Sequence, residues 1–473
     1  MAHTQEGNQA PAGSPAPTRH VAIVGAGYVG LSSAVCLADL GHRVTAMDID
    51  AHRVDTLQQA VSPIFEEGLD ELLAKHRSTN RLRFTTSMAR ALKGAEFVFL
   101  CVATPAGADG AMDLAQVRAA TVAIAEGLPA DQRVVIVIKS TLPVGTGDEI
   151  EELMRRHAPA ADFTVVSNPE FLREGRAVYD VFHPDRIVIG ATEPAAAAAL
   201  SELYADLPGE RIVTDRRSAE LIKQASNAFL ATKISFANQL AELCERVGAD
   251  ASVVAHGMEL DPRIAPGHLS AGLGYGGSCL PKDVEGLRAS AAAVGVDMRL
   301  LATVQEVNRH QRARIVERLG VVLGGLTGKN IAIWGLAFKE GTDDVRDSPA
   351  LGIINLLREA GVANIRAYDP QAMGRAMTLV PVVHLSADPY DAAADADAIV
   401  LTTAWPEFGE VDLARVAGLM RGSVLLDGRN QLDEQDVRAA GLQYLGIGRR
   451  NDQPAQTPPT RSSQVRRVTG SNR

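Results

Sequence analysis

The stretch HVAIVGAGYVG, residues 20–30, constrains the fold of this chain more than any other feature. The apolar run HVAIV suits a strand buried in a parallel sheet. Gly25, Gly27 and Gly30 follow it at G-x-G-x-x-G spacing. The first glycine allows a tight turn, the second lets a pyrophosphate approach the backbone, and the third lets helix and strand pack closely. An apolar helical pattern then runs to Gly41, so the sequence predicts a dinucleotide site at a helix N-terminus.

The acid that ends the second expected strand, RVTAMD, selects the cofactor. Asp48 is placed to bond a ribose 2′-hydroxyl and would repel a 2′-phosphate, which favours NAD over NADP. Asp50 is the competing acid, and Arg53 is expected near the adenosine ribose. The alternative is a glycine turn that serves packing alone.

Strand and helix patterns alternate up to about residue 215. The apolar runs FVFLCVAT, RVVIVIKST, FTVVSNPEF and RIVIGA are separated by helical segments. This alternation predicts a parallel sheet covered on both faces. Near Lys329 the pattern restarts with NIAIWGLAFKEG, and later runs lead through ANIRAYDP to GSVLLDGRN, so a second sheet of the same kind is expected.

Residues 216–248 separate the two sheets and contain no proline, and no glycine before Gly248. One long helix is predicted here, with Gly248 as its stop. The apolar positions with helical spacing are Leu221, Ile222, Ala225, Ala228 and Phe229. Further helices are expected to about Gly320, and this all-α block could also supply a dimer surface.

The expected fold class is α/β, with two Rossmann-like, doubly wound parallel-sheet domains joined by a central all-α block with a long helix. The predicted divisions are a flexible tail at 1–18, an NAD-binding domain at 19–215, a helical dimerisation domain at 216–325, a second Rossmann-like domain at 326–449 and a disordered tail at 450–473.

Composition excludes several classes of protein. The 473 residues suit two or three domains, and no apolar run approaches the roughly 18 residues of a spanning helix. The net charge of −10 disfavours nucleic acid as the main partner. Four distant cysteines without a CxxC pair argue against disulfides and a structural zinc site, so no metal is expected and a cytoplasmic location is predicted. Three of these cysteines, Cys36, Cys101 and Cys244, are interpreted as small buried hydrophobes.

The fourth cysteine, Cys279, lies in GYGGSCLPKD. Pro281 suits the first turn of a helix, which places the thiol at a helix N-terminus. That position and nearby Lys282 would favour a thiolate, and the glycines leave room for a substrate. Lys223 and Asn227 lie one turn apart on the long helix, where they could point an ammonium and an amide at a developing alkoxide. The alternatives are a buried inert thiol and a solvated polar stripe.

Four motifs together resemble the UDP-glucose/GDP-mannose dehydrogenase family: STLPVGT, SNPEFLREG, GYGGSCLPKD and FKEGTDDVRDSP. The resemblance covers nearly all of the chain except the tails. NPEFLREG followed by HPDRIVIG, with DPRI before the thiol, is most similar to the members that oxidise UDP-glucose. His268 and Leu280 depart from the aromatic residues usual at these positions, so oxidation of GDP-mannose stays the nearest alternative.

The resemblance implies two successive NAD-linked oxidations of one sugar carbon, from alcohol to aldehyde to acid. The second oxidation needs a nucleophile, because an aldehyde has no hydroxyl group to oxidise. A thiolate adds to it, the thiohemiacetal gives up hydride, and the thioester is hydrolysed. By motif position, the catalytic residues implied are Cys279 as nucleophile, Lys223 and Asn227 as oxyanion stabilisers, Asp283 and Thr141 in the water network, and Glu170 as general base.

The resemblance also implies binding residues. Those implied for NAD, beyond the glycine turn, Asp48 and Arg53, are Tyr28, Val29, Thr104, Thr141, Glu174 and Arg346. Those implied for the nucleotide-sugar are Glu170, Phe171, Leu172, Lys223, Asn227, His268, Leu269, Ser270, Ala271, Gly272, Gly276, Phe338, Lys339 and Arg429. Arg263 is expected to reach into a partner subunit's site, in a homodimer or larger assembly.

Two other classes remain open from the sequence. A two-electron alcohol or hydroxyacid dehydrogenase would share the glycine turn but would have no use for Cys279. A non-enzymatic dinucleotide sensor would bind NAD without turnover.

Overall fold

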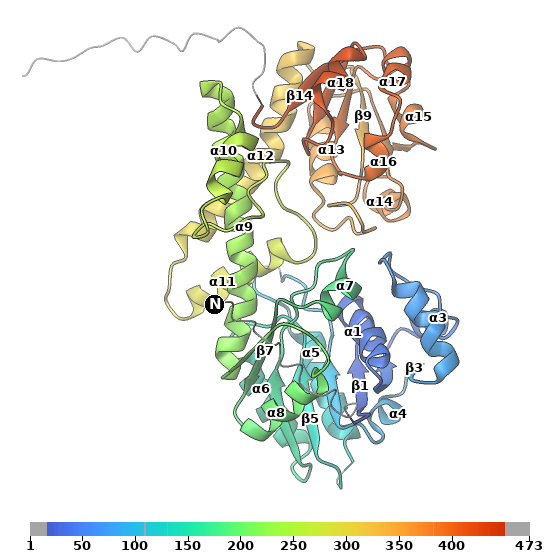
Figure 1. Cartoon of the computed structure of the whole chain (residues 1–473), viewed down its shortest axis with the longest axis vertical. Helices are drawn as coiled ribbons and strands as arrows, with labels where there is room; N and C mark the ends of the chain where they lie inside the picture. Colours follow the sequence, from blue (N-terminus) through green and yellow to red (C-terminus); the bar gives the residue numbers. More distant parts are fainter. Residues whose placement is uncertain (1–16, 108–109, 130, 382, 450–473) are drawn as a thin grey trace, which may run out of the picture.

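Two sheet-containing units lie at opposite ends of the molecule, and a long helix runs from one to the other (Figure 1). The computed structural model describes residues 17–107, 110–129, 131–381 and 383–449. The tails predicted at 1–18 and 450–473 lie outside these ranges, apart from residues 17 and 18.

The first unit is built on an eight-stranded sheet with the order β3-β2-β1-β4-β5-β6-β7-β8. Side chains on alternate positions of β1 pack on opposite faces: Val21 and Ile23 join one apolar cluster, and Ala22 and Val24 join the other. Both faces are therefore buried, as expected of a doubly wound sheet. The strands are β1 His20–Val24, β2 Arg43–Met47, β3 Leu82–Thr85, β4 Phe97–Leu100, β5 Val134–Ile138, β6 Phe163–Ser167, β7 Arg186–Ala191 and β8 Glu210–Thr214.

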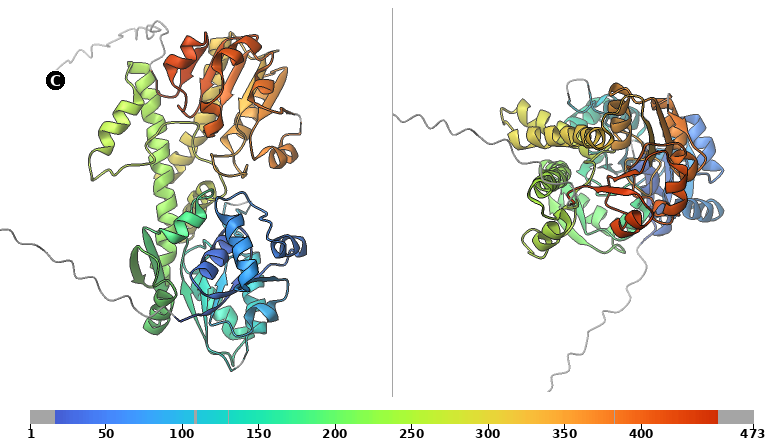
Figure 2. Two further views of the ribbon diagram at one scale, coloured as in Figure 1. Left: turned by 45° about the vertical axis from the view of Figure 1, so that its right-hand side comes forward. Right: turned by 90° about the horizontal axis from the view of Figure 1, so that it is seen from above.

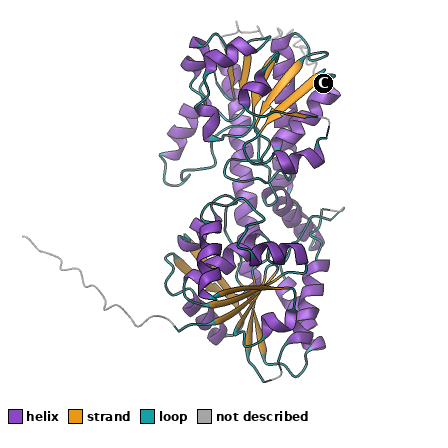
Figure 3. Cartoon of the chain, turned by 90° about the vertical axis from the view of Figure 1, so that its right-hand side faces the viewer, coloured by secondary structure: helices purple, strands orange, loops and turns teal. Residues whose placement is uncertain are grey.

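Helices cover both faces of this sheet (Figure 3). They are α1 Tyr28–Asp39, α2 Ala51–Gln58, α3 Leu69–Thr79, α4 Met88–Leu92, α5 Ala115–Gly127, α6 Thr146–His157, α7 Ala177–Phe182 and α8 Pro194–Leu203. The antiparallel pairing of β7 with β6 differs from the expected all-parallel order. Residues 168–185 connect β6 to β7 at the carboxyl end of β6. The chain does not first return to the amino end of the sheet, as it would before a parallel strand. This places the NPEFLREG segment at the edge of the sheet where ligands bind in such folds.

The helical block contains α9 Arg216–Val247, α10 Ala251–Glu259, α11 Leu280–Ala293 and α12 Arg299–Leu323. With 32 residues, α9 is about 48 Å long. The Asp215 side chain caps it by accepting a hydrogen bond from the backbone N–H of Ser218, and Gly248 ends it with a left-handed φ of 76°. The expected stop is confirmed.

The burial of α9 differs from what its apolar positions suggested. Leu221 is 43% exposed and Phe229 is 64% exposed, whereas Glu220, Lys223 and Asn227 are buried. The polar face is turned inward because its side chains meet partners on the first sheet unit and on α11. The large apolar side chains of Leu221 and Phe229 are left uncovered within one chain, whereas the small Ala228 is buried with the polar residues.

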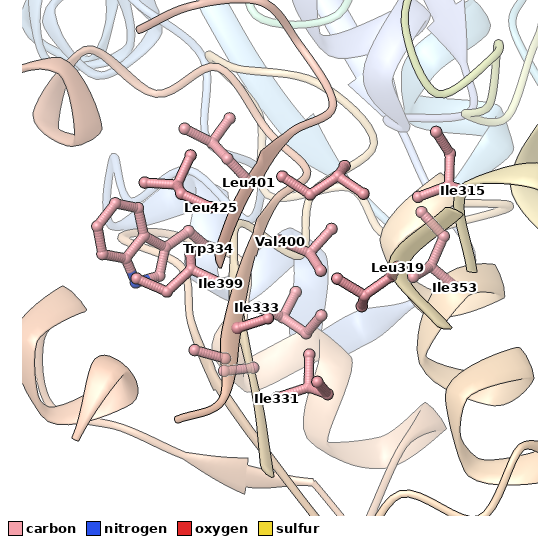
Figure 4. Packing of buried hydrophobic residues seen from close by; sticks show 14 of the residues in the cluster. Ile315, Leu319, Ile331, Ile333, Trp334, Ile353, Ile399, Val400, Leu401 and Leu425 are labelled. Atoms are coloured by element: carbon pink, nitrogen blue, oxygen red, sulfur yellow. The ribbon is translucent and has the colours of Figure 1, made fainter. Parts of the chain in front are cut away.

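The second unit is a six-stranded sheet with the order β11-β10-β9-β12-β13-β14, parallel throughout. Its core joins Trp334 and Ile333 of β9 to Val400 of β12 and, on the far side, to Ile315 and Leu319 of α12 (Figure 4). Because α12 contributes to this core, the helical block and the second sheet form one packed body. The strands are β9 Asn330–Trp334, β10 Asn364–Tyr368, β11 His384–Leu385, β12 Ala398–Leu401, β13 Val424–Asp427 and β14 Gln443–Gly446.

The helices of the second unit are α13 Pro349–Glu359, α14 Met373–Leu379, α15 Pro389–Ala393, α16 Pro406–Gly409, α17 Leu413–Leu419 and α18 Glu434–Ala439. The side view in Figure 2 also shows the two units stacked along the axis of α9. The predicted fold class is therefore confirmed. Among the described residues, no helix has both the length and the apolar content that a membrane crossing requires.

Candidate active site

The candidate site lies where loops of the first sheet unit meet α9, α11 and the second sheet unit. Gly175 and Gly341 approach so closely that a Cβ on Gly175 would lie 2.4 Å from the Gly341 carbonyl oxygen. Both glycines also have positive φ. A cavity of about 700 Å³ opens beside this junction. Six of the predicted substrate residues line it: Glu170, Phe171, Leu172, Lys223, Asn227 and His268.

Lys223 and Glu170 form a buried ion pair in this cavity, with 3.0 Å between Nζ and Oε1. Burial lowers the pKa of Lys223, but the carboxylates of Glu170 and Asp283 outweigh it and the net pKa is raised. Lys223 is therefore an ammonium at neutral pH. The second carboxylate oxygen of Glu170 accepts a 2.6 Å hydrogen bond from the backbone N–H of Leu172, which orients the acid.

Asn227 and Asp283 connect α9 to α11. The Asn227 amide donates to Asp283 Oδ2 at 2.6 Å, and Lys282 Nζ donates to Oδ1 at 2.5 Å. The Asp283 side chain is almost fully buried. The Lys282 ammonium is thus paired with Asp283, next to Lys223 and Asn227 of the predicted site.

Cys279 occupies the N-cap position of α11, as the sequence indicated, and its side chain makes no capping hydrogen bond. Its thiol is not pre-ionised, however. Burial and the Glu170 and Glu174 carboxylates together raise the pKa of Cys279 to about 11, and Lys223 only partly opposes them. The expectation that the helix N-terminus and Lys282 hold a thiolate is therefore wrong, because two acids and a dry environment outweigh them. Cys36, Cys101 and Cys244 are buried, as interpreted from the sequence.

The glycine turn between β1 and α1 has the shape that a dinucleotide pyrophosphate needs. Gly25 has φ +96°, and a Cβ on Gly30 would lie 1.8 Å from the Gly25 carbonyl oxygen. A Cβ on Gly27 would meet no atom within 4 Å, so the backbone is open on the ligand side. The residues present therefore fit NAD.

Asp48, the residue after β2, lies beside this glycine turn. Its carboxylate accepts hydrogen bonds from the backbone N–H of Ala26 at 2.8 Å and of Asp50 at 3.0 Å. Arg53 lies 3.2 Å from Asp48 Oδ2. Asp50 instead caps α2 by accepting from the Arg53 backbone N–H. The competing acid is thus engaged in helix capping, whereas Asp48 lies against the glycine turn, and its role as the ribose ligand stays a prediction.

The other predicted cofactor residues gather around the same edge. Tyr28 and Val29 form the first turn of α1. The Thr104 hydroxyl donates to the Thr141 carbonyl oxygen at 3.0 Å, which joins two neighbouring loops. Arg346 of the second unit reaches across to Glu174, with 3.5 Å between Nη2 and Oε1.

The corresponding turn in the second unit is closed. Asp369 Oδ2 accepts from the backbone N–H groups of Leu336 and Ala337, as Asp48 does from Ala26. The Trp405 indole N–H also donates to Asp369 Oδ2 at 3.0 Å. Because the ring of Trp405 occupies the place next to the acid, this turn offers no ribose pocket.

The predicted nucleotide-sugar residues of the second unit lie along its face toward the junction. Arg429 donates from Nη2 to the Phe338 carbonyl oxygen at 2.9 Å and from Nε to the Thr402 carbonyl oxygen at 2.7 Å. The Lys339 ammonium lies 5.8 Å from the centre of the Phe338 ring. A Cβ on Gly276 would collide with the Asp347 carbonyl oxygen.

The stretch 268–272 joins the helical block to this face. The Gly272 backbone N–H donates to Asn238 of α9 at 2.8 Å, and a Cβ on Gly272 would lie 3.1 Å from the Gly428 carbonyl oxygen. Leu269 is buried, whereas His268 and Ser270 are exposed and Ala271 is half-buried. Arg263 does not join the site of its own chain: its side chain is 87% exposed and is paired with Asp261.

Two residues of the site, the buried Glu66 and the half-buried Lys139, were missed from the sequence. Glu66 accepts hydrogen bonds from Tyr28 at the cofactor turn and from the backbone N–H of Gly175, and burial raises its pKa to about 6. The Lys139 ammonium donates to Asn168 Oδ1 at 2.9 Å, and desolvation lowers its pKa to about 8. The only sequence signal for either was a charged residue beside an expected strand or turn.

Three family models cover the chain in order. They describe the NAD-binding domain of the UDP-glucose/GDP-mannose dehydrogenase family at residues 19–208, its central domain at 217–310 and its UDP-binding domain at 332–434. The chain belongs to this family. The predicted resemblance is thus confirmed, and the protein is an NAD-dependent oxidoreductase.

Individual members of the dehydrogenase family differ in how similar they are to this chain. UDP-glucose 6-dehydrogenase YwqF of Bacillus subtilis is 45% identical over 433 residues, which are 91% of this chain and 98% of the relative. A UDP-glucose dehydrogenase of Pyrobaculum islandicum has a TM-score of 0.87 and 37% identity, covering 93% of this chain and 100% of that structure. A GDP-mannose dehydrogenase from Pseudomonas aeruginosa has a TM-score of 0.52 and 29% identity, covering 90% and 99%.

Proposed function

We propose that this chain oxidises the C6 alcohol of UDP-glucose to the carboxylate of UDP-glucuronate, a four-electron oxidation that consumes two NAD. The observation that carries the proposal is the meeting of one thiol, Cys279, with the buried Lys223–Glu170 pair beside a cavity of about 700 Å³. A two-electron dehydrogenase would need the ammonium but not the thiol.

NAD bound at the glycine turn supplies the hydride acceptor for both oxidations. In the first, the C6 hydroxyl loses its proton as its carbon loses hydride. Lys223, held as an ammonium by Glu170 and Asp283, stabilises the negative charge that develops on the oxygen. Asn227 holds Asp283, and we assign to this acid, with Thr141, the water that receives the proton.

In the second oxidation, the Cys279 sulfur bonds to the aldehyde carbon and the carbonyl π electrons move to oxygen, beside Lys223. Loss of hydride from the same carbon leaves a thioester. Glu170 then acts as general base: it takes a proton from water, whose oxygen bonds to the carbonyl carbon as the carbon–sulfur bond breaks. The products are the acid and the free sulfur of Cys279.

The choice of UDP-glucose over GDP-mannose is supported by the relatives. The UDP-glucose dehydrogenase structure has a TM-score of 0.87 with this chain, against 0.52 for the GDP-mannose dehydrogenase. The third family model is also described as a UDP-binding domain. We assign Phe338, Lys339, Arg429 and Gly276 to the nucleotide part, and the cavity residues to the sugar.

We further propose a homodimer formed through α9. Four exposed apolar side chains follow one another along this helix, the first three at intervals of seven: Phe229, Phe236, Leu243 and Val247. An apolar stripe of this kind is typical of a helix that packs against another helix. Arg263, exposed in one chain, would then be free to reach the partner subunit's site. A cytoplasmic location remains a prediction.

A panel of nucleotide-sugars with purified protein and NAD tests the proposed function. We expect UDP-glucose to give two NADH per sugar and UDP-glucuronate by mass spectrometry. NADH from GDP-mannose alone would transfer the proposal to that sugar, and one NADH per UDP-glucose would favour the two-electron class. Binding of NAD with no turnover of any sugar would favour a sensor.

A further inference from the structure

Ser278, the residue before the nucleophile, has no role in the steps above. Its hydroxyl lies between the Cys279 thiol and the Glu174 carboxylate. Its hydroxyl donates to Glu174 Oε1 at 2.7 Å. On its other side the same oxygen lies 3.4 Å from Cys279 Sγ. Thiol, hydroxyl and carboxylate therefore form one continuous hydrogen-bonded row.

Cys279 needs such a path, because its surroundings oppose ionisation. Burial, together with the carboxylates of Glu170 and Glu174, raises the pKa of the thiol to about 11. Lys223 lowers this pKa only in part, and Lys223 is already paired with Glu170. The carboxylate that raises the thiol pKa through space is also the one connected to it through Ser278.

Glu174 is suited to accept a proton near neutral pH. Burial and the neighbouring Asp344 carboxylate together raise the pKa of Glu174 to about 7, although Ser278 and Arg346 oppose them. The Asp344 side chain is in hydrogen-bond contact with Glu174, and two adjacent carboxyl groups favour the binding of a proton. The pKa of Glu174 is thus in the range that suits a general base.

We propose that Ser278 and Glu174 form a proton relay that activates Cys279 when the sulfur attacks the aldehyde. This relay rests on the proposed function and adds residues to it. As the carbon–sulfur bond forms, the thiol proton passes to the Ser278 oxygen and the Ser278 hydroxyl proton passes to Glu174. The carbonyl oxygen becomes the negative atom and faces Lys223. When the thioester is hydrolysed, the same path returns the proton to the departing sulfur.

The relay and a purely electrostatic effect of Glu174 predict opposite results. If Glu174 acts only through its charge, Glu174→Gln removes a repulsive carboxylate and makes the thiol more reactive, while Ser278→Ala changes little. If the relay operates, both substitutions remove the proton acceptor path and make the thiol less reactive.

The test is the rate of Cys279 alkylation by iodoacetamide in the full chain, followed by peptide mass spectrometry from pH 6 to 9. We expect Ser278→Ala and Glu174→Gln each to slow alkylation at pH 7.5 by about tenfold or more. We also expect the wild-type rate to rise with a midpoint near pH 7 that Glu174→Gln removes. The other charged groups facing this row are Glu170, Lys223, Asp283, Lys339, Asp344 and Arg346, all unchanged in both variants.

Faster alkylation in Glu174→Gln, or an unchanged rate in Ser278→Ala, would overturn the relay. Ser278→Thr keeps a hydroxyl and should restore the rate; alkylation as slow as in Ser278→Ala would count against the relay as well. Cys279→Ser gives the background from the three buried cysteines, and thermal unfolding checks that each variant is folded. Alkylation needs no nucleotide-sugar, so failure of the relay is distinguishable from failure of the proposed substrate.

Discussion

At the scale of single residues, the chemistry depends on a neutral thiol and a charged ammonium that lie in one buried site. Burial and the carboxylates of Glu170, Glu174 and Asp283 hold Cys279 protonated, whereas Glu170 and Asp283 hold Lys223 charged. A carboxylate pair that stabilises an ammonium must disfavour a neighbouring thiolate. The thiol therefore becomes nucleophilic only when a proton acceptor and an electrophile are both at hand.

Replacing Cys279 by Ala should separate the two oxidations. The variant keeps Lys223 for the alcohol-to-aldehyde step, but no thiohemiacetal can form. We expect UDP-glucuronate formation to fall by at least about 10³-fold, with any residual NADH no more than one per sugar. The measurement is NADH absorbance with product mass spectrometry. Cys244→Ala, whose thiol is buried at the far end of α9, is the matched control and should keep two NADH per sugar.

Replacing Lys223 by Met should remove the oxyanion stabiliser while keeping the length of the side chain. We expect the single-turnover rate of NADH formation to fall by about 10²–10³-fold. Calorimetry with UDP-glucose provides the control: a variant that binds the sugar normally but reacts at the wild-type rate would contradict the role of Lys223.

At the scale of elements, α9 depends on polar anchors. Its first residue, Arg216, is buried and donates to Glu151 Oε2 at 2.5 Å and to Asp148 Oδ1 at 2.6 Å, both on α6. Next to it, Glu220 accepts from the backbone N–H groups of Gly145 and Gly147 at the N-terminus of α6. These contacts fix the rotation of α9, and this rotation turns Lys223 and Asn227 into the site.

Arg216→Leu should therefore lower the free energy of unfolding by roughly 2–3 kcal/mol, because it leaves two carboxylates without their buried partner. Burial raises the pKa of Asp148 and of Glu151, but hydrogen bonds from arginines outweigh it and both are lowered. A lowered carboxyl pKa contributes stability above the unfolded-state pKa, and this contribution is lost as the pH falls through the folded-state value. The difference between wild type and variant should thus shrink below about pH 4.

The measurement for Arg216→Leu is the midpoint of urea unfolding, followed by far-ultraviolet circular dichroism at pH 7 and at pH 3.5. The matched control is Arg217→Leu, the exposed neighbour that also contacts Asp148. An exposed ion pair contributes less than about 1 kcal/mol, so this control should stay close to wild type. Equal losses in both variants would contradict an anchoring role for Arg216.

At the scale of the whole molecule, the site is assembled between two units, and short contacts hold them together. The ring centres of Phe65 in the first unit and Trp405 in the second are 6.4 Å apart, and Arg375 donates to the Pro63 carbonyl oxygen. The same segment carries Glu66, which contacts Tyr28 and Gly175. Residues 63–66 therefore connect the position of the second unit to the cofactor turn.

The assembly of whole molecules should depend on the exposed stripe of α9. Phe236 is 50% exposed at the middle of this stripe, so Phe236→Asp would place a charge in a desolvated interface. We expect the variant to sediment as a monomer at concentrations where the wild type is dimeric. Val294→Asp, which replaces an exposed apolar residue outside α9, is the control and should remain dimeric. A dimeric Phe236→Asp variant would exclude this interface.

Local patterns were enough to predict much of the molecule. The glycine turn, the strands around it, the long helix with its Gly248 stop and the position of Cys279 at a helix N-terminus all follow from residues close together in the chain, because turn geometry and side-chain periodicity are local properties. The family motifs extended these predictions to the cofactor and to the reaction class.

Only the tertiary structure decided the rest, because burial and charge depend on neighbours that are distant in sequence. It turned Lys223 and Asn227 of α9 inward and the large apolar Leu221 and Phe229 outward, reversed β7 against β6, and placed Trp405 beside the acid of the second glycine turn. It also placed Glu174 beside Ser278, 104 residues away in the chain, and raised the thiol pKa where the sequence suggested the opposite. A helix N-terminus is visible in a sequence, but the acids that oppose it are brought there only by folding.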